Sequence, residues 1–327
     1  MELLYWSAIF AASLFVLLKS ADYFIEAAES IGIKLKIPTF IVGATIVAFG
    51  TSLPELAASV AAVFHGGENS SSIIIGNVVG SNISNIFLIA GISILVSASF
   101  VVDMKKQLRE FLILILSAIL TIGFLWDFEI NLFEAIVMTC CLVGYIVYIL
   151  VYPHDEEEEE EAENDLLGAP NYALFLVFLV SGILIAAGAK YTVESIIKIS
   201  DIMGYPPEAI SLTAVALGTS LPELAVSLSA ARKGLSNLIL GNIIGSNIFN
   251  SFCVLGIPGI IAYSQGETIV ASEAIKNFSL PMMGVATLLF VLLGLKKNTP
   301  NYAGLVFILL YVFFIAGVYA GVNLLDF

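Results

Sequence analysis

The sequence is poor in charged residues, and this scarcity already excludes several classes of protein. Only 12% of the 327 residues are charged, whereas 59% are hydrophobic. A typical soluble domain has about 25% charged and about 45–50% apolar residues. With a mean hydropathy of +1.00, the chain is not an ordinary soluble enzyme, a disordered protein or a nucleic-acid-binding domain.

Histidine and cysteine are scarce as well. The two histidines, His65 and His154, lie at loop ends, so Ser–His catalysis would have no base within an apolar stretch. Three cysteines cannot build a disulfide framework and are expected to be small buried hydrophobic residues. No phosphate-binding loop is present, so ATP hydrolysis on this chain is not the energy source. We therefore expect neither an enzyme nor a bound cofactor.

The net charge of −14 is concentrated in one segment. Nine of the 27 acidic residues lie between Asp155 and Asp165. Such a run is typical of a solvated, self-repelling linker, and a regulatory cation-binding loop is the alternative.

Long apolar stretches are abundant. A helix needs about 20 apolar residues to cross a bilayer, and ten stretches of about that length or more form two groups of five. The first group covers roughly residues 3–31, 37–64, 72–97, 107–126 and 129–152. The second covers roughly 170–200, 206–231, 237–263, 276–295 and 301–324. We predict an all-α polytopic membrane protein with a first five-helix unit over 1–152, a linker over 153–169 and a second unit over 170–327.

Basic residues predict the orientation in the cell membrane, because Lys and Arg are enriched on the cytoplasmic side. With the N-terminus outside, the inner side holds Lys34, Lys36, Lys105, Lys106, Arg109, Arg232, Lys233, Lys296 and Lys297. The outer side holds only Lys198 and Lys276 near span ends. Both termini are therefore predicted outside and the 153–169 linker inside.

The two groups of spans contain an internal repeat. Residues 45–66 and 213–234 share 14 of 22 positions without a gap, and both contain GTSLPE. Residues 76–91 and 241–256 share nine of 16, and both contain GNxxGSNxxN. Because five is an odd number of crossings, the second copy must enter from the opposite side. Inverted repeats are the architecture of many secondary transporters, which bind their substrates near the bilayer midplane.

The GTSLPE motif combines a helix break with a carboxylate. Pro54 and Pro222 each remove a helical hydrogen bond, so we expect helices 2 and 7 to be broken just before the proline. Freed carbonyls are tolerated in a bilayer where they line a protein cavity, and there they can bind a cation. Glu55 and Glu223 follow directly, and an acid this deep in a span is a functional candidate. A protonated glutamate that hydrogen-bonds between helices is the structural alternative.

Hydroxyl and amide side chains accompany each acid. Helical spacing places a threonine and a serine near each carboxylate, namely Thr51 and Ser52, and Thr219 and Ser220. GNxxGSNxxN adds a hydroxyl and an amide four residues apart, namely Ser81 and Asn85, and Ser246 and Asn250. Its glycines permit close helix contact. The other asparagines, Asn77, Asn82, Asn242 and Asn247, are expected to hydrogen-bond between helices. An all-oxygen ligand set with two carboxylates suits Ca²⁺ or Na⁺, and buried glutamates can also carry protons.

GTSLPE followed by GNxxGSNxxN, occurring twice and inverted, resembles the α-repeats of the cation/Ca²⁺ exchanger superfamily. Ten spans with a linker between the fifth and sixth are similar to its prokaryotic sodium/calcium exchanger family. The resemblance covers essentially the whole chain. It implies a secondary active antiporter in which Na⁺ influx drives Ca²⁺ extrusion by alternating access, with helices 1 and 6 sliding against the core.

The resemblance also implies a role for each matching residue. Glu55 and Glu223, with the backbone carbonyls of Thr51 and Thr219, would bind Ca²⁺. Flanking Na⁺ sites would use Ser52, Ser220, Ser81 and Ser246 with the carbonyls of Ala48 and Ala216, and Asn85 and Asn250 would lie in the middle. The partners implied are Ca²⁺, Na⁺ and the lipid bilayer, without nucleic acid or an obligate protein partner.

Two features bear on the choice of counter-ion. Some relatives, including potassium-dependent ones, have an acid at the position of Asn250, so we expect no K⁺ requirement here. The proton/calcium branch usually has a GNAxE-type signature, so GTSLPE favours Na⁺. A H⁺/Ca²⁺ exchanger that uses the same two glutamates remains the first alternative, and a cation channel the second.

Overall fold

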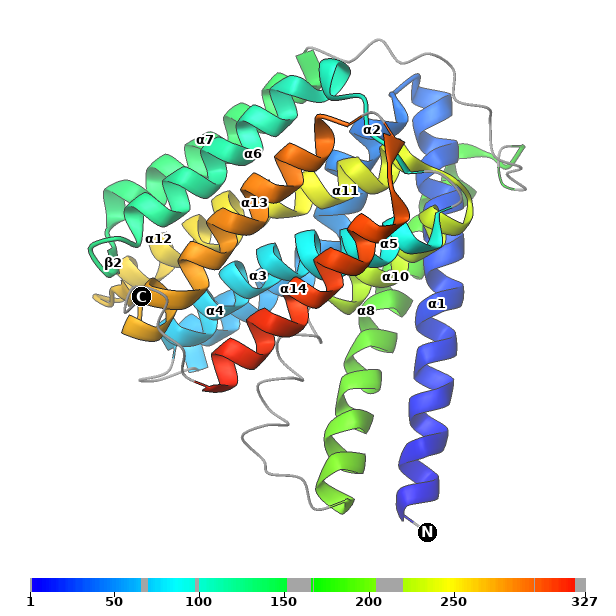
Figure 1. Ribbon diagram of the computed structural model, residues 1–327. Coiled ribbons are helices and arrows are strands. Elements are labelled where there is room, and N and C mark those ends of the chain that lie inside the picture. The colour runs from blue at the N-terminus through cyan, green and yellow to red at the C-terminus, as the bar shows by residue number, and fades with distance from the viewer. Residues whose placement is uncertain are drawn as a thin grey trace.

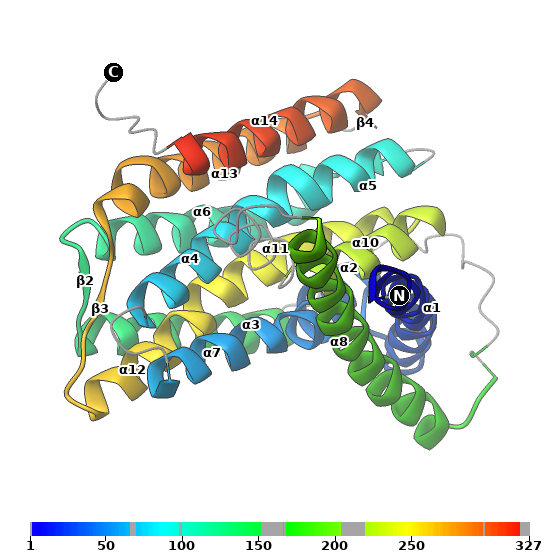
Figure 2. The same cartoon turned by 90° about the horizontal axis from the view of Figure 1, so that it is seen from below.

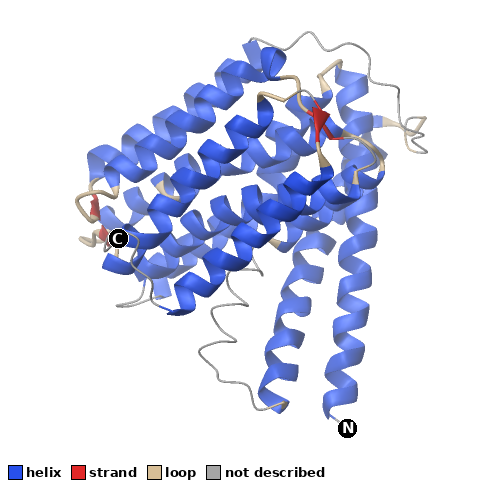
Figure 3. Ribbon diagram, in the orientation of Figure 1, coloured by secondary structure: helices blue, strands red, loops and turns tan. Residues whose placement is uncertain are grey.

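The computed structural model describes residues 2–65, 70–97, 100–151, 166, 168–203, 220–296 and 298–320. These residues are almost entirely helical (Figure 3). Nine helical segments within them are long and apolar enough to cross a membrane. They match nine of the ten predicted spans. The seventh predicted span, 206–231, is described only from Ser220 onward, and the acidic run Asp155–Asp165 lies outside the described residues.

The elements follow one another along the chain as α-helices with short π-helical segments, which are labelled η. The part of the chain before the acidic run forms α1 (Glu2–Leu35), α2 (Thr39–Val42), η1 (Gly43–Val47), α3 (Ala48–His65), α4 (Ser70–Ile83), η3 (Ser84–Ala90), α5 (Gly91–Val96), α6 (Met104–Phe124) and α7 (Leu132–Val151). The part after it forms α8 (Asn171–Ile202), α10 (Leu221–Arg232), α11 (Ser236–Phe249), η4 (Asn250–Val254), α12 (Gly256–Ser264), η5 (Ile275–Ser279), α13 (Leu280–Gly294) and α14 (Asn301–Ala320).

Helices α1 and α8 pack along each other, and their lower ends extend together beyond the other helices (Figure 1). The rings of Phe24 and Phe178 stack with their centroids 4.5 Å apart. The hydroxyl of Thr192 donates a hydrogen bond of 3.0 Å to Ser13 Oγ. Both contacts join the first helix of one predicted unit to the first helix of the other.

Helix α11 lies at the centre of the bundle, where it contacts α2, η1, α3 and α10 (Figure 2). Its glycines allow backbone contact with the first half of the chain. A Cβ atom at Gly241 would lie 2.2 Å from the carbonyl oxygen of Phe40, and one at Gly245 would lie 2.4 Å from that of Ala44. The close approach predicted from the small-residue spacing is confirmed for these two glycines. It is wrong for their repeat equivalents Gly76 and Gly80, where no described atom lies within 4 Å of an added Cβ.

Four two-residue strands join loops from the two halves of the chain. Strand β1 (Phe100–Val101) pairs antiparallel with β4 (Asn298–Thr299), and β2 (Glu129–Ile130) with β3 (Ile269–Val270). In the predicted repeat, β1 and β3 occupy equivalent loops, as do β2 and β4. Each strand pair therefore joins the loop after the third span of one unit to the loop after the fourth span of the other unit. The sequence did not predict the strands, because two residues are too few to show an alternating pattern.

The irregularity of the second span is not where the proline predicts it. Helix α3 continues from Ala48 to His65 with Pro54 inside it, and the departure from α-helical geometry is the π-helix η1 upstream. A membrane helix tolerates an internal proline where neighbouring groups satisfy the freed backbone. In the later copy Pro222 lies in the first turn of α10, which begins at Leu221 after Ser220 at the N-cap.

Candidate cation-binding site

Two buried carboxylates face the centre of the bundle from α3 and α10. Glu55 and Glu223 are each only 1% exposed. Ser52, one turn before Glu55 on α3, donates a hydrogen bond of 3.0 Å from its Oγ to Oε1 of Glu223. This bond connects the two copies of GTSLPE directly, so the structure brings together the acids that the sequence predicts.

Most of the oxygen atoms of these carboxylates are not used by the protein. Among the described residues, neither oxygen of Glu55 nor Oε2 of Glu223 has a hydrogen-bond partner. The hydroxyl of Ser220 and both side-chain atoms of Asn85 and Asn250 are also buried without one. An unsatisfied buried polar group costs about 1–3 kcal/mol. These unpartnered polar groups lie on segments that contact one another, which indicates a site built for a ligand that they bind together.

Asn85 and Asn250 lie in π-helical turns, η3 and η4, at equivalent positions of the repeat. Segment η3 contacts α10, which bears Glu223, and η4 contacts α3, which bears Glu55. Each amide therefore belongs to an element that packs against the carboxylate helix of the other half. π-Helical turns are frequent at functional sites. They could not be predicted here, because their residues continue an ordinary helical pattern.

The other predicted ligands differ in how free their side chains are. The hydroxyl of Thr51 lies 3.2 and 3.4 Å from the carbonyl oxygens of Val47 and Ala48, to which it can donate, and its backbone carbonyl is the atom predicted to bind Ca²⁺. Ser246 is fully buried and its Oγ lies 3.5 Å from Oδ1 of Asn242, and Ser81 is buried on α4. Thr219 and Ala216 lie outside the described residues.

Further asparagines hold the carboxylate helices in place. Asn77 donates to the carbonyl of Glu55 and to Ser59 Oγ, both at 3.0 Å. Asn242 makes the equivalent bond to Ser227 Oγ at 2.9 Å. The interhelical role predicted for these two residues is confirmed.

The remaining pair of asparagines is not symmetric. Asn82 donates to Ser251 Oγ at 3.0 Å, which joins the two halves and confirms its interhelical role. Asn247 instead donates to the carbonyl of Ile243 in its own helix at 2.7 Å. The prediction was wrong for this bond, because helical spacing alone does not reveal which carbonyl an amide reaches.

Asn77 gives a testable contrast with its repeat equivalent. Asn77→Ala removes two buried hydrogen bonds, so we expect it to lower the free energy of unfolding by about 2 kcal/mol. Asn242→Ala loses one donated bond and should cost less. Denaturant unfolding of the purified variants in detergent measures both, with the exposed Asn171→Ala as control. An equal loss in Asn171→Ala would contradict the assignment.

The distribution of charge around Glu55 and Glu223 favours a bound cation. The segments α3, α4, η3, α11 and η4 contain no Lys or Arg, and the only basic residue of α10 is Arg232 at its end. Two carboxylates therefore lie in a low-dielectric environment without a positively charged side chain from these segments. Burial of an unpaired charge is very unfavourable, and a bound Ca²⁺, Na⁺ or proton relieves it.

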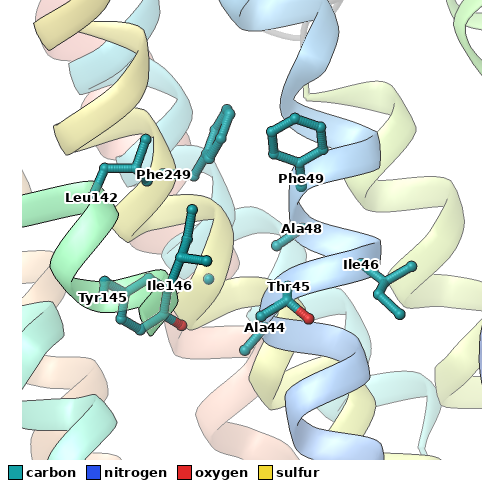
Figure 4. Close-up of a pocket in the computed structure, with 10 residues that line it drawn as sticks. Ala44, Thr45, Ile46, Ala48, Phe49, Leu142, Tyr145, Ile146 and Phe249 are labelled. Carbon is teal, nitrogen blue, oxygen red and sulfur yellow. The ribbon is translucent and has the colours of Figure 1, made fainter. Parts of the chain in front are cut away.

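An apolar cavity of about 330 Å³ lies beside these helices (Figure 4). Ala48 and Phe49 line it from α3, and Phe249 from α11, with the two rings in edge-to-face contact at 5.1 Å. Its one threonine, Thr45, already donates to the carbonyl of Ile41 at 2.7 Å. Tyr145 adds one buried hydroxyl without a partner among the described residues, and the other walls are largely apolar, so the cavity offers a hard cation few side-chain oxygen ligands.

Comparison with known proteins identifies the family. The family model described as sodium/calcium exchanger protein matches residues 5–151 and 173–320. The chain belongs to the sodium/calcium exchanger family. It is thus a multi-pass membrane transporter rather than an enzyme, as the sequence motifs predict.

Individual relatives match over most of their length. The sodium/calcium exchanger MaX1 of Methanosarcina acetivorans is 32% identical over 91% of this chain and 94% of its own. A putative antiporter, CaxA of Alkalimonas amylolytica, is 37% identical over 86% and 88%. The solved structure of the sodium-calcium exchanger NCX_Mj soaked with Na⁺ and Sr²⁺ superposes with a TM-score of 0.81 at 28% identity, covering 96% of this chain and 99% of that one.

A sodium/potassium/calcium exchanger matches only in part. The sodium/potassium/calcium exchanger 4 of Mus musculus is 34% identical over 41% of this chain and 21% of its own. The likeness of the whole chain is therefore to the sodium/calcium exchangers.

Proposed function

We propose that this exchanger moves Ca²⁺ out of the cell in return for Na⁺, with Glu55 and Glu223 as the shared ion ligands. The observation that carries the proposal is the buried pair of carboxylates, which retains three unpartnered oxygens among the described residues. Ca²⁺ takes six to eight oxygen ligands and favours carboxylates. Two negative charges match one Ca²⁺, and they are equally able to accept several Na⁺ in its place.

The ligands are assigned as follows. Ca²⁺ lies at the centre, bound by Glu55 and Glu223 and by the carbonyls of Thr51 and Thr219. Na⁺ ions use the flanking oxygens of Ser52, Ser220, Ser81 and Ser246 and the carbonyls of Ala48 and Ala216, and Asn85 and Asn250 lie between the two groups. The free hydroxyl of Ser220 and the free amides of both asparagines support this assignment.

The same proposal covers the arrangement in the cell membrane. The units 1–152 and 170–327 are inverted copies on either side of the 153–169 linker, with both termini outside and the linker in the cytoplasm. The two cross-connected strand pairs and the equivalent bonds of Asn77 and Asn242 support the repeat. The distribution of Lys and Arg supports the orientation.

Uptake of ⁴⁵Ca²⁺ into proteoliposomes that contain the purified protein tests the exchange. Identical vesicles are loaded with Na⁺, with K⁺, or with a pH gradient and no Na⁺. We expect uptake only from the Na⁺-loaded vesicles. Uptake driven by the pH gradient alone would instead assign the protein to H⁺/Ca²⁺ exchange, and uptake without any counter-ion gradient would indicate a channel.

Independence from potassium is a separate prediction. Both middle positions of the site are amides, Asn85 and Asn250, so the site offers two carboxylates and no third charge for K⁺. Na⁺-driven Ca²⁺ uptake should therefore be the same whether the external solution contains K⁺ or choline. A several-fold stimulation by K⁺ would refute this reading of Asn250.

A further inference from the structure

A basic pocket lies between α1 and α10, at the end of α10 remote from Glu223. Its volume is about 310 Å³. Its walls include three basic side chains, Lys19, Arg232 and Lys233, and two acidic ones, Asp22 and Glu26. None of these residues belongs to the ligand set of the proposed ion site, so the pocket needs an explanation of its own.

The acidic side chains of the pocket already form ion pairs or hydrogen bonds within the protein. Lys233 Nζ lies 2.6 Å from Glu26 Oε1, and Lys19 Nζ lies 3.4 Å from Asp22 Oδ2. Asp22 also accepts a hydrogen bond of 2.7 Å from Ser229. Arg232 is exposed and has no partner among the described residues. The pocket therefore has one positive charge in excess, on a guanidinium whose planar donors suit a phosphate.

An apolar groove adjoins this pocket on the other side of Tyr23. The groove has a volume of about 340 Å³ and lies between α1 and α8, where Leu176, Val177, Val180 and Leu184 line it. Tyr23 lines both the groove and the basic pocket. Figure 2 shows α1, seen along its axis, beside both α8 and α10. A cationic pocket that shares a wall with an apolar groove has the polarity of a site for an anionic amphiphile.

The position of the pocket indicates which class of anionic amphiphile it binds. Helix α10 ends at Arg232, and Gly234, with φ of 75°, turns the chain out of the helix. The ends of membrane-spanning helices lie at the level of the lipid headgroups, and the Lys and Arg distribution predicts that this end is cytoplasmic. Basic pockets between membrane helices on that side are known to bind anionic headgroups.

We propose that this pocket and groove bind one anionic phospholipid. Its phosphate contacts Arg232, beside the Lys233–Glu26 pair, and one acyl chain lies along α8 in the groove. A lipid placed here would contact α1, α8 and α10 together. The proposal requires only the membrane location of the protein and is independent of which ions it exchanges.

Lipid titration of the purified full chain in detergent tests the proposal. The melting temperature is followed against phosphatidylglycerol and against phosphatidylcholine with the same acyl chains. We expect phosphatidylglycerol to stabilise at lower concentration, and Arg232→Gln to weaken its apparent affinity about 10-fold or more, because a charge-assisted hydrogen bond is lost. Lys296→Gln, which removes an exposed charge outside the pocket, should leave the affinity unchanged.

A bulky side chain placed in the groove tests whether an acyl chain binds there. Val180→Trp should also weaken phosphatidylglycerol binding, whereas Val312→Trp, at a comparably exposed position on α14, should not. Melting without added lipid shows whether each variant folds. Equal effects of the two lipids on the wild type, or full phosphatidylglycerol affinity in Arg232→Gln, would overturn the proposal. So would Arg232-dependent stabilisation by inorganic phosphate with no effect of Val180→Trp, because this describes a site for free anions.

Discussion

Glu55→Gln is expected to reduce Na⁺-driven Ca²⁺ uptake to the level of protein-free vesicles. The substitution preserves the shape of the side chain but removes one of the two charges that face the cation. At contact distance a unit charge pair contributes about 4 kcal/mol at an effective dielectric constant of about 20, and a divalent ion gains more. Loss of that energy corresponds to roughly three orders of magnitude in binding affinity.

Glu223→Gln should be equally inactive, because Oε2 of Glu223 is as free of partners as the oxygens of Glu55. Its Oε1 accepts the hydrogen bond of Ser52, and the amide oxygen of Gln can accept this bond as well. The variant should therefore fold. Glu267→Gln, in the exposed turn before β3, is the control and should transport normally.

The assay is ⁴⁵Ca²⁺ uptake into Na⁺-loaded proteoliposomes, with the melting temperature of each variant in detergent as the test of folding. Uptake near the wild-type rate in either Gln variant would show that its carboxylate is not an ion ligand. The two-charge site would then be wrong, even though the family assignment would stand.

Candidate residues for the site could be proposed from the sequence because polar groups inside an apolar span are easy to recognise. An acid inside an apolar span has few tolerable environments, and Glu55 and Glu223 each occur with a proline and hydroxyls. Because this pattern occurs twice, the two copies could be paired from the sequence alone. The hydrogen bond from Ser52 to Glu223 is an addition from the structure, because the motif spacing relates Ser52 only to Glu55 of its own copy.

The geometry around those residues was not predictable to the same degree. Pro54 indicated a break that the structure replaces by a π-helical segment at Gly43–Val47. Whether a freed carbonyl ends a helix depends on which neighbours satisfy it, and those neighbours are distant in sequence. The π-helical turns at Asn85 and Asn250 and the short strand pairs depend in the same way on tertiary contacts, which no local pattern reveals.

Gly241→Ala is expected to destabilise the protein strongly, although alanine favours helices by about 1 kcal/mol over glycine. The new Cβ would lie 2.2 Å from the carbonyl oxygen of Phe40 and 2.8 Å from the amide nitrogen of Ala44. Both obstacles are backbone atoms, so no side-chain rotation relieves the clash. Overpacking of this kind costs typically 1–3 kcal/mol, and we expect the upper end, about 3 kcal/mol.

The control is Gly144→Ala on α7, where no described residue lies within 4 Å of the new Cβ. This variant should unfold at the same denaturant concentration as the wild type or at a higher one. If Gly241→Ala behaves like Gly144→Ala, the backbone contact between α11 and the α2–η1 segment does not exist in the membrane protein.

The same clash should also affect ion binding, because η1 leads directly into α3. Any shift that separates η1 from α11 moves Ser52 and Glu55 relative to α10, and the 3.0 Å bond from Ser52 to Glu223 depends on that placement. We therefore expect Gly241→Ala protein that still folds to need a higher Ca²⁺ concentration for half-maximal uptake, whereas Gly144→Ala should not. Destabilisation without any change in Ca²⁺ dependence would show that the carboxylates hold their positions independently of the glycine contact.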